Sequence, residues 1–458
     1  MKVIVCGAGL VGTTIARQLA AEGNEVTVID QSVEQAHKLA ESYDLRALVG
    51  HASHPDLLDR AGAADADMLI AVTYADEVNM VACEVAHALF KVPTKIARIR
   101  AQSYLRPEWS DLFNGEHISI DHIISPEIEV ARAIHRRILT PGAFDMIPFA
   151  GDRLRLIGVR LTEDCPVLNT PLRQLTELFP GLEINVCGIA RGDEVIVPEG
   201  DDQLVAGDEI YFVAVTDHVP RAMRLFGHEE REARRLVLAG GGNIGLFLAR
   251  EIEAQESAVK LKLIEGNRAR AEYVAGQLKS SVVIQGDTLD MDILTEAKVQ
   301  SAEAIIALTN DDEVNILASL LAKRAGCQRA ITLVNNPAYE NLIGSLGVDV
   351  VVNPRSTTVS SILQYVRRGR IRSVHSLRDG AAEVMEAVAV DSSSLLGRPI
   401  GELDLPAGLM IGALIRKDDI LIVRSDIEIE AGDRMILFVR KEAVKKVEKL
   451  FSVRLEFF

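Results

Sequence analysis

Aromatic residues and cysteines are scarce in this chain of 458 residues. Phenylalanine, tyrosine and tryptophan together make up 4% of the sequence, with Trp109 as the single tryptophan, so few side chains are available to stack on nucleic-acid bases or sugars. The cysteines form no CxxC motif and pair with no histidine at a metal-ligand spacing; they are Cys6, Cys83, Cys165, Cys187 and Cys327. A scattered, odd set of this kind predicts reduced structural thiols in a cytosol.

Positive charge is also in deficit, and long hydrophobic runs are missing. Lysine and arginine number 50 against 66 aspartates and glutamates, a formal net charge of -16, which argues against nucleic acid as the main partner. The longest uncharged stretches, 3–16 and 236–249, each contain three or more glycines and fall short of the about 20 apolar residues that a membrane-spanning helix needs. The N-terminus shows no signal-peptide cleavage site. We therefore expect a soluble, intracellular protein.

A long internal repeat is present instead. The segment VIVCGAGLVG at 3–12 is matched by LVLAGGGNIG at 236–245. Three further blocks repeat in the same order at nearly constant separation: 25–30 with 260–265, 67–73 with 303–309, and 204–213 with 429–438. We interpret the chain as a tandem duplication of an N-type module followed by a C-type module.

The two module types differ in their predicted fold. N-type modules alternate short β-branched runs with helical patterns, which predicts an α/β, Rossmann-like domain with a parallel sheet. In the first module we expect strands at 2–6, 25–29, 47–49, 68–72 and 95–99, with helices such as 11–22 and 77–90 between them. The C-type modules predict a small α+β domain with an antiparallel sheet and one short helix. In the first of these we expect strands at 155–161, 184–190, 194–197 and 209–214, and the helix near 172–178.

Two predicted linker helices, 127–139 and 357–368, separate the modules. Each begins just after a proline and carries basic residues near its end, as suits a helix N-terminus and the helix dipole. The predicted domains are a first nucleotide-binding module at 1–123, a linker helix at 124–141, a first C-type module at 142–226, a second nucleotide-binding module at 232–352, a linker helix at 354–371 and a second C-type module at 372–453.

A dinucleotide-binding fingerprint opens the first module. Gly7-Ala8-Gly9-Leu10-Val11-Gly12 follows a predicted strand and begins a helix, and Asp30 ends the next strand. The first glycine permits a tight turn, the second a close approach to a pyrophosphate, and the third close packing of helix and strand. The diphosphate is then bound by free backbone N–H groups at the helix N-terminus. Asp30 is expected to accept both ribose hydroxyls and to repel a 2′-phosphate, which favours NAD, NADH or ATP over NADP. The alternative is that the glycines serve only the turn.

The second module repeats this pattern with a longer acidic side chain. Gly240-Gly241-Gly242-Asn243-Ile244-Gly245 replaces the first fingerprint, and Glu265 carries the same charge as Asp30. We expect a bound nucleotide here too, although a duplicated site often diverges. The candidate contacts in this module are Ala239, Gly240, Gly241, Gly242, Asn243, Gly245, Glu265 and Thr309.

Further candidates end the later strands, at the edge where open α/β sheets bind ligands. His51 and Asp287 are expected on the adenine side. Thr73, Tyr74, Thr309 and Asn310 end the fourth strands, and Arg98 ends a fifth strand from which a guanidinium could reach the phosphates. The counterpart of Arg98 is Leu333, so the two sites are not equivalent. The candidate contacts of the first site are Gly7, Ala8, Gly9, Leu10, Val11, Gly12, Asp30, His51, Thr73, Tyr74 and Arg98.

Two other sets of polar residues near these strands receive structural interpretations. Asp76 and Asp312 are predicted to cap the helices that follow. His51 and His54 are interpreted as polar loop residues, since neither carboxylate nor cysteine companions accompany them as metal ligands would require. We predict no metal site.

No catalytic set accompanies the nucleotide motifs. Hydride transfer needs a proton donor or acceptor near the nicotinamide. The C-type modules show no Ser/Tyr/Lys set and no His–acid pair in an informative context, and His218 and His375 fall at their edges. We therefore interpret the nucleotide as a ligand and the protein as no enzyme. An NAD-dependent oxidoreductase stays open as an alternative.

The ordered motifs resemble a known family. The glycine fingerprint, the acidic strand end, the Thr-x-x-Asp-Glu-Val-Asn run at 73–79, the Ser-Pro-Glu-Ile start of the linker helix and the Gly-Asp-rich C-type module are similar to domains that regulate potassium conductance (RCK domains). Two such units in one chain resemble the TrkA family, the peripheral NAD-binding subunits of bacterial Trk potassium uptake systems. The stretches 50–55 and 97–100 carry the resemblance to this group most specifically.

The resemblance implies a regulatory role. It implies NAD(H) and adenine nucleotides (ATP or ADP) as ligands of the N-type modules, and a homotetrameric ring. It also implies a position at the cytoplasmic face of the inner membrane, beneath an integral-membrane potassium-translocating subunit of the TrkH or TrkG type. The contacts that it implies by position are 7–11, Asp30, Thr73, Tyr74 and Arg98 in the first module, and 239–243 and Glu265 in the second. A regulator of another potassium channel or of an efflux antiporter has the same sites and stays open.

Overall fold

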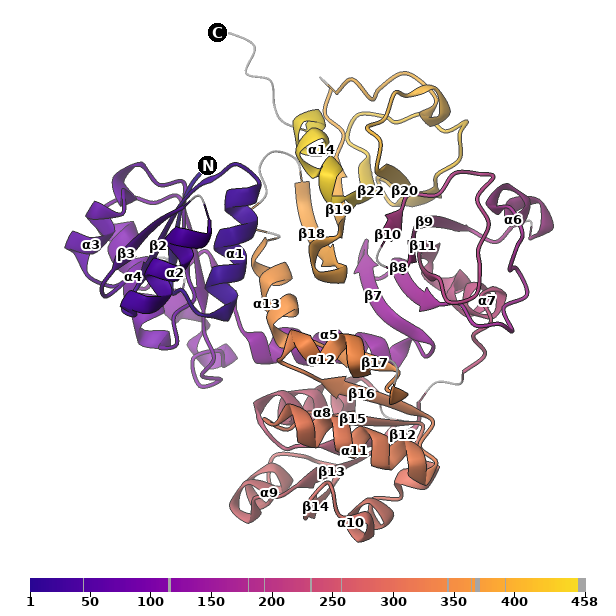
Figure 1. The fold of residues 1–458 in the computed structure, drawn as a ribbon, viewed down its shortest axis with the longest axis horizontal. Coiled ribbons are helices and arrows are strands. Elements are labelled where there is room, and N and C mark those ends of the chain that lie inside the picture. The colour runs from indigo at the N-terminus through magenta and orange to yellow at the C-terminus, as the bar shows by residue number, and fades with distance from the viewer. Residues whose placement is uncertain are drawn as a thin grey trace. The chain divides into compact units, whose positions relative to one another are not determined.

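The chain folds into two separately packed units (Figure 1). The computed structural model describes residues 1–43, 45–113, 117–179, 181–192, 194–230, 233–256, 258–343, 346–363, 365–366, 371–391 and 393–451. Packing groups Met1–Val130 with Pro354–Val366 in the first unit, and Ala131–Asn353 with Arg367–Phe458 in the second. Arg367 and Arg368, expected as the basic end of the second linker helix, lie outside the described residues, as does Asp193.

A six-stranded parallel sheet forms the first N-type module, in the order β3-β2-β1-β4-β5-β6. Its strands are β1 (Lys2–Cys6), β2 (Glu25–Asp30), β3 (Arg46–Val49), β4 (Met68–Ala71), β5 (Thr94–Arg98) and β6 (His122–Ile124). Its helices are α1 (Leu10–Ala21), α2 (Val33–Ser42), α3 (Pro55–Arg60) and α4 (Asp76–Ala88). The predicted strands are present, and β6 was missed. The strand order reverses between β1 and β4, and this is where a parallel sheet opens a crevice for a ligand.

Both faces of this sheet are buried, which explains the nearly continuous apolar strands. Along β1, Ile4 and Cys6 join one apolar cluster, while Val3 and Val5 join the cluster on the opposite face. The second cluster is completed by α13 (Pro354–Leu363), which comes from the second half of the sequence. The linker helix after the second N-type module therefore packs on the first N-type module.

The second N-type module repeats the same sheet, in the order β14-β13-β12-β15-β16-β17. Its strands are β12 (Arg235–Ala239), β13 (Lys260–Glu265), β14 (Val282–Gln285), β15 (Ala304–Ala307), β16 (Arg329–Leu333) and β17 (Val350–Val352). Its helices are α8 (Asn243–Gln255), α9 (Arg268–Ala275), α10 (Met291–Glu296), α11 (Asp312–Ala325) and α12 (Pro337–Ile343). The identical order in both modules confirms the duplication read from the sequence.

The first linker helix, α5 (Pro126–Leu139), crosses the division between the two packed units. Its last turn contacts the second N-type module. The partly buried guanidinium of Arg329 in β16 donates to the backbone carbonyl oxygens of Arg137, at 3.1 Å, and of Ala143. The first bond satisfies one of the carbonyl groups that a helix end leaves unpaired, and the second reaches the first residue of β7.

Each C-type module is an antiparallel five-stranded sheet. The orders are β10-β9-β11-β8-β7 and β18-β19-β22-β20-β21, equivalent when the second is reversed. The first contains β7 (Ala143–Phe149), β8 (Leu154–Arg160), α6 (Leu172–Leu178), β9 (Ile184–Arg191), β10 (Glu194–Ile196), β11 (Glu209–Val215) and α7 (Val219–Leu225). The second contains β18 (Ile371–Leu377), β19 (Ala382–Val388), β20 (Leu409–Arg416), β21 (Asp419–Ile422), β22 (Arg434–Arg440) and α14 (Val444–Phe451). The expectation of a single helix in the first is wrong, because α7 covers its core, and β7 was not predicted. The α/β fold class is confirmed, while the exact domain limits stay predictions.

The two C-type sheets share one apolar core. It includes Tyr211 and Val213 of β11 together with Phe438 of β22, and the rings of Tyr211 and Phe438 lie 5.8 Å apart. Burying these faces against each other removes from water the apolar surface that a small sheet cannot cover alone.

Candidate functional site

The first glycine loop connects β1 to α1 in the geometry that a phosphate site requires. Gly7 has φ +111°, a conformation that L side chains rarely adopt. A Cβ on Gly12 would overlap the carbonyl oxygen of Gly7, so only glycine lets the helix start this close to the strand. Gly9 is the N-cap of α1 and provides no side-chain cap. The first N–H groups of α1 are therefore available to an anion.

Asp30 is held at the end of β2 by the backbone around it. Its Oδ2 accepts from the N–H of Ala8 at 2.5 Å, and its Oδ1 accepts from the N–H of Ser32 at 2.7 Å. A carboxylate has about four acceptor positions. Two backbone bonds fix its orientation and leave acceptor capacity for ribose hydroxyls beside the glycine loop.

Asn79 ties the ends of β4 and β5 together from inside α4. Its side chain is fully buried. Its Oδ1 accepts from the N–H and the hydroxyl of Thr73, at 2.9 and 2.7 Å. Its Nδ2 donates to the carbonyl oxygens of Thr73 and Arg98, at 3.2 and 2.9 Å. The spacing of the 73–79 motif did not indicate a role for this asparagine, and its complete burial explains why its type is required.

Arg98 lies at the β5 end with part of its guanidinium unpaired. One terminal nitrogen donates to the carbonyl oxygen of Thr73 at 3.0 Å, while Nε is buried and has no hydrogen-bond partner among the described residues. Burial, and then the charge of Arg100, lower the pKa of Arg98 from its ordinary value. A half-buried guanidinium with unused donors at the sheet's carboxyl edge fits a phosphate.

The remaining candidates of the first site lie on its rim. Tyr74 is 85% exposed, and the guanidinium of Arg100 lies 5.8 Å from its ring centre. His51 stacks on His54 with ring centres 4.8 Å apart and shares a hydrogen bond with Ser53. Among the described residues, no group of three or more histidines, cysteines, aspartates or glutamates has the geometry to hold a metal ion.

Asp76 and Asp312 do not cap the following helices, so that expectation is wrong. Asp76 is the first residue of α4, and its carboxylate accepts from the N–H groups of Arg100 and Ala101. Asp312 accepts in the same way from Asn335 and Asn336, while Asp311 caps α11. Both carboxylates therefore brace the loop after the fifth strand. The sequence could not distinguish these roles, because they depend on which loop folds over the helix start.

The second site repeats this architecture around a cleft of about 750 Å³. Gly240 has φ +112°, and a Cβ on Gly245 would overlap its carbonyl oxygen. Glu265 Oε2 accepts from the N–H of Gly241 and Oε1 from the N–H of Asn267, both at 2.8 Å. Asn315 repeats the bonds of Asn79, joining Thr309 to Leu333. The cleft volume lies in the range of small-molecule sites.

Of the residues predicted around the second site, six line the cleft: Gly240, Gly242, Glu265, Asp287, Thr309 and Asn310. Ala239, Gly241, Asn243 and Gly245 form the surrounding loop and helix start without lining it. Asn267 and Arg270 also line the cleft and were not predicted from the sequence. The sequence does contain a signal for both residues. Asparagine is a preferred helix-capping residue, which marks the start of α9 at Asn267, and Arg270 lies one turn later in that helix.

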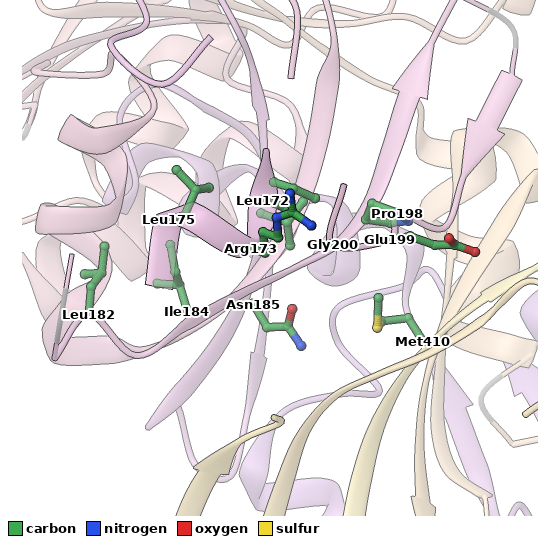
Figure 2. A pocket seen from close by; sticks show the side chains of 11 residues that line it. Leu172, Arg173, Leu175, Leu182, Ile184, Asn185, Pro198, Glu199, Gly200 and Met410 are labelled. Atoms are coloured by element: carbon green, nitrogen blue, oxygen red, sulfur yellow. The ribbon is translucent and has the colours of Figure 1, made fainter. Parts of the chain in front are cut away.

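A further cavity lies in the C-type pair and was not predicted. It measures about 190 Å³, and side chains from α6, β9 and β20 converge on it, among them Leu172, Asn185 and Met410 (Figure 2). Its one arginine, Arg173, forms an exposed ion pair with Asp201. The lining thus offers no buried charge for a ligand.

Comparison with known proteins follows the same duplicated pattern. The TrkA-N domain family matches residues 3–126 and 236–354, and the TrkA-C domain family matches 156–227 and 384–452. The chain belongs to the TrkA family. It is 50% identical over 458 residues to the Trk system potassium uptake protein TrkA of Azorhizobium caulinodans, covering 100% of both chains. It is 42% identical to that of Halomonas elongata, again over 100% of both chains, and 41% identical to that of Vibrio alginolyticus over 99% of both.

Solved structures show the TrkA-family fold at lower sequence similarity. The GsuK channel aligns with a TM-score of 0.61 at 19% identity, covering 98% of this chain and 78% of that one. The GsuK channel bound to NAD gives 0.60 with the same identity and coverage. Among the residues that the structure describes, no helix has the length and apolarity to cross a membrane.

Proposed function

We propose that this chain is the nucleotide-sensing regulatory subunit of a Trk-type potassium uptake system. The observation that carries the proposal is the repeated arrangement around the two glycine loops. In both N-type modules an uncapped helix start, a glycine loop and a carboxylate held by backbone N–H groups meet at the crevice of a parallel sheet. That combination binds an adenosine diphosphate through its phosphates and its ribose.

The ligand in this proposal is NAD or NADH, with ATP or ADP as alternatives at the same sites. Asp30 and Glu265 bind the ribose hydroxyls and disfavour a 2′-phosphate by charge repulsion. In the first site, Arg98 supplies the positive charge for the phosphates from the end of β5, with a guanidinium whose Nε has no hydrogen-bond partner among the described residues. The fold similarity to a GsuK channel whose structure contains NAD supports this choice of ligand.

The partner in this proposal is an integral-membrane potassium-translocating subunit of the TrkH or TrkG type. Full-length relatives named as Trk system potassium uptake proteins support it. The chain would form a homotetramer at the cytoplasmic face of the inner membrane, and ligands with different affinities for two conformations of that assembly would shift the gate of the partner. The same relatives favour this partner over another potassium channel or an efflux antiporter.

Calorimetric titration of the purified protein with NAD, NADH, ATP and ADP tests the ligand. We expect binding that Asp30→Asn weakens at one site and Glu265→Gln at the other, each by about tenfold or more, because a charged acceptor of two hydroxyls is lost. Asp65→Asn is the matched control, since that carboxylate is exposed and pairs only with Lys2 at the surface. If none of the four nucleotides binds, the proposal is refuted.

Two further measurements separate a sensor from an enzyme and test the partner. A sensor leaves the nicotinamide absorbance of NADH unchanged during incubation with small carbonyl compounds, whereas an oxidoreductase consumes it. The partner is tested by reconstituting a TrkH-type subunit in vesicles. Potassium flux that changes with nucleotide only when this chain is added supports the proposed role, and flux that ignores the chain contradicts it.

A further inference from the structure

The two proposed nucleotide sites differ at the ends of the fourth and fifth strands, beyond the glycine loop that would bind the pyrophosphate. Three positions there are Tyr74, Arg98 and Arg100 in the first module, and their counterparts in the second are Asn310, Leu333 and Asn335. The correspondence is fixed by shared bonds, since Asn79 and Asn315 bind the carbonyl oxygens of Arg98 and Leu333. Asp76 and Asp312 likewise bind the N–H groups of Arg100 and Asn335. This end of the second cleft therefore has no cation at either arginine position.

The second cleft has a cation at its other end instead. Arg270 lines it from α9. Its Nε donates to the carbonyl oxygen of Gly241 at 2.7 Å, and a terminal nitrogen lies 3.4 Å from Oδ1 of Asn243, the first residue of α8. One face of the guanidinium lies 5.1 Å from the ring centre of Tyr273. These contacts place the positive charge at the glycine loop, beside the helix start that receives a diphosphate.

The first cleft has no cation at this position. Ser32 accepts from the N–H of Gln35 as Asn267 accepts from that of Arg270, so Gln35 is the counterpart of Arg270. The arginines of the two sites thus lie on opposite sides of the glycine loop: Arg98 and Arg100 follow β5 in the first, and Arg270 lies on the helix after the acidic strand in the second.

We propose that Arg270 makes the second cleft bind the adenosine diphosphate core of a nucleotide, with an affinity that does not depend on the groups attached beyond the diphosphate. This rests on the proposed function and specifies the ligand class of one of its sites. Arg270 supplies the charge for the diphosphate that every adenine nucleotide ligand shares. Asn310, Leu333 and Asn335 provide no charge that would separate ATP from ADP, or either from ADP-ribose and NAD.

The insensitivity follows from the distance between Arg270 and the groups beyond the diphosphate. A charge-assisted hydrogen bond acts over one contact, and the attraction between charges at the cleft surface falls with separation and with screening by salt. A γ-phosphate or a nicotinamide riboside points toward the β16 end, away from Arg270. Its charge therefore adds little in this cleft, whereas in the first cleft the same group approaches Arg98.

The test isolates the second cleft in the full-length protein by Asp30→Ala, which disables the first. Calorimetric titration with ADP, ATP, ADP-ribose and NAD is expected to give dissociation constants within about threefold of one another, a spread under 1 kcal/mol. Arg270→Gln, which installs the residue of the first module, is expected to weaken all four by a similar factor of about ten. Adenosine, which lacks the diphosphate, is expected to bind the variant as it binds the parent.

Two controls separate this role from a merely structural one. Arg268→Gln, on the same helix but paired only with exposed Glu272, is expected to leave all dissociation constants unchanged. Gln35→Arg, introduced with Glu265→Ala so that only the first cleft is measured, is expected to increase ADP affinity severalfold at this exposed position.

The outcomes are distinct. A second cleft that prefers ATP to ADP by more than tenfold overturns the inference, as does loss of adenosine affinity equal to the loss of ADP affinity in Arg270→Gln. If wild-type protein binds none of these nucleotides, the proposed function fails before the inference is reached.

Discussion

Nε of Arg355 in α13 donates a hydrogen bond to Oγ1 of Thr14 in α1, at 2.9 Å. Arg355 comes from the second half of the duplicated sequence, and Thr14 lies one turn into the helix that begins at the first glycine loop. Below this bond, Val359 and Ile362 of α13 pack in the same apolar cluster as Ile15 and Leu19 of α1. The helix start proposed to bind a diphosphate is therefore supported by the linker of the other repeat.

The packing of α13 on α1 predicts a loss of stability in the first unit when it is weakened. Ile362 is fully buried, and Ile362→Ala is expected to lower the free energy of unfolding by about 2–5 kcal/mol, because a cavity replaces the side chain. Trp109, the single tryptophan, lies in this unit, so its fluorescence during urea denaturation reports on it selectively. Ser360→Ala on the same helix is the control and is expected to change little. Equal midpoints for both variants would show that α13 does not stabilise the unit.

An ion pair between a buried aspartate and a partly exposed arginine recurs at the Gly-Asp turn of each C-type module. Asp208 is 1% exposed and receives two hydrogen bonds from Arg191, both at 2.8 Å, and Asp433 is bound in the same way by Arg416. Arg191→Gln leaves Asp208 buried without its charge partner and is expected to cost about 3 kcal/mol of stability. Arg173→Gln, which breaks an exposed pair, is expected to cost less than about 1 kcal/mol. Thermal denaturation measures both, and similar melting temperatures would contradict the prediction.

The buried hydrogen bonds of Asn79 predict a loss of stability when its amide group is replaced by a carboxyl group. Asn79→Asp keeps the acceptor for Thr73 but removes the two bonds donated by Nδ2 and places a charge at a fully buried position. We expect the variant to lose about 3 kcal/mol or more of stability near neutral pH. Because protonation of the new carboxyl restores one donor, the deficit relative to wild type should shrink on acidification. A deficit that is constant between pH 7 and pH 4 would refute this account.

His375 predicts an acid-sensitive second C-type module. Burial, and then the charge of Arg136, lower its pKa to about 4, although Asp145 acts in the opposite direction. The unfolded chain takes up this proton near pH 6.5, and the folded chain only near pH 4. Stability from this group is therefore fully present above pH 6.5 and falls as the pH drops toward 4, by about 3 kcal/mol.

His375→Gln is the variant that isolates this titration. The ring meets Phe149 edge-on at 5.9 Å, so the substitution also changes packing, but a packing change is independent of pH. The expected result is a shallower slope of unfolding free energy between pH 6.5 and pH 4 than in wild type. Parallel slopes for the two proteins would mean that His375 keeps its ordinary pKa in the folded chain.

Local patterns made much of the fold predictable. Alternating apolar runs and helical periods placed the first five strands of the first module within a few residues, because a strand buried on both faces must be apolar. The sixth strand was missed, since β6 is short and joins the edge of a sheet already formed. In the candidate sites, Asp30 and Glu265 were predicted from spacing alone, whereas Asn267 and Arg270 were not.

The sequence by itself determined the duplication, the glycine loops and the acidic strand ends. These are encoded in neighbouring residues through backbone geometry: Gly7 for a positive φ, and Gly12 for a close approach of helix to strand. Tertiary structure alone decided that α13 supports the first module, that Asp76 and Asp312 brace a loop, and that Arg270 faces the cleft. Such contacts join residues far apart in the chain, and burial and hydrogen-bond pairing select them only when whole elements dock.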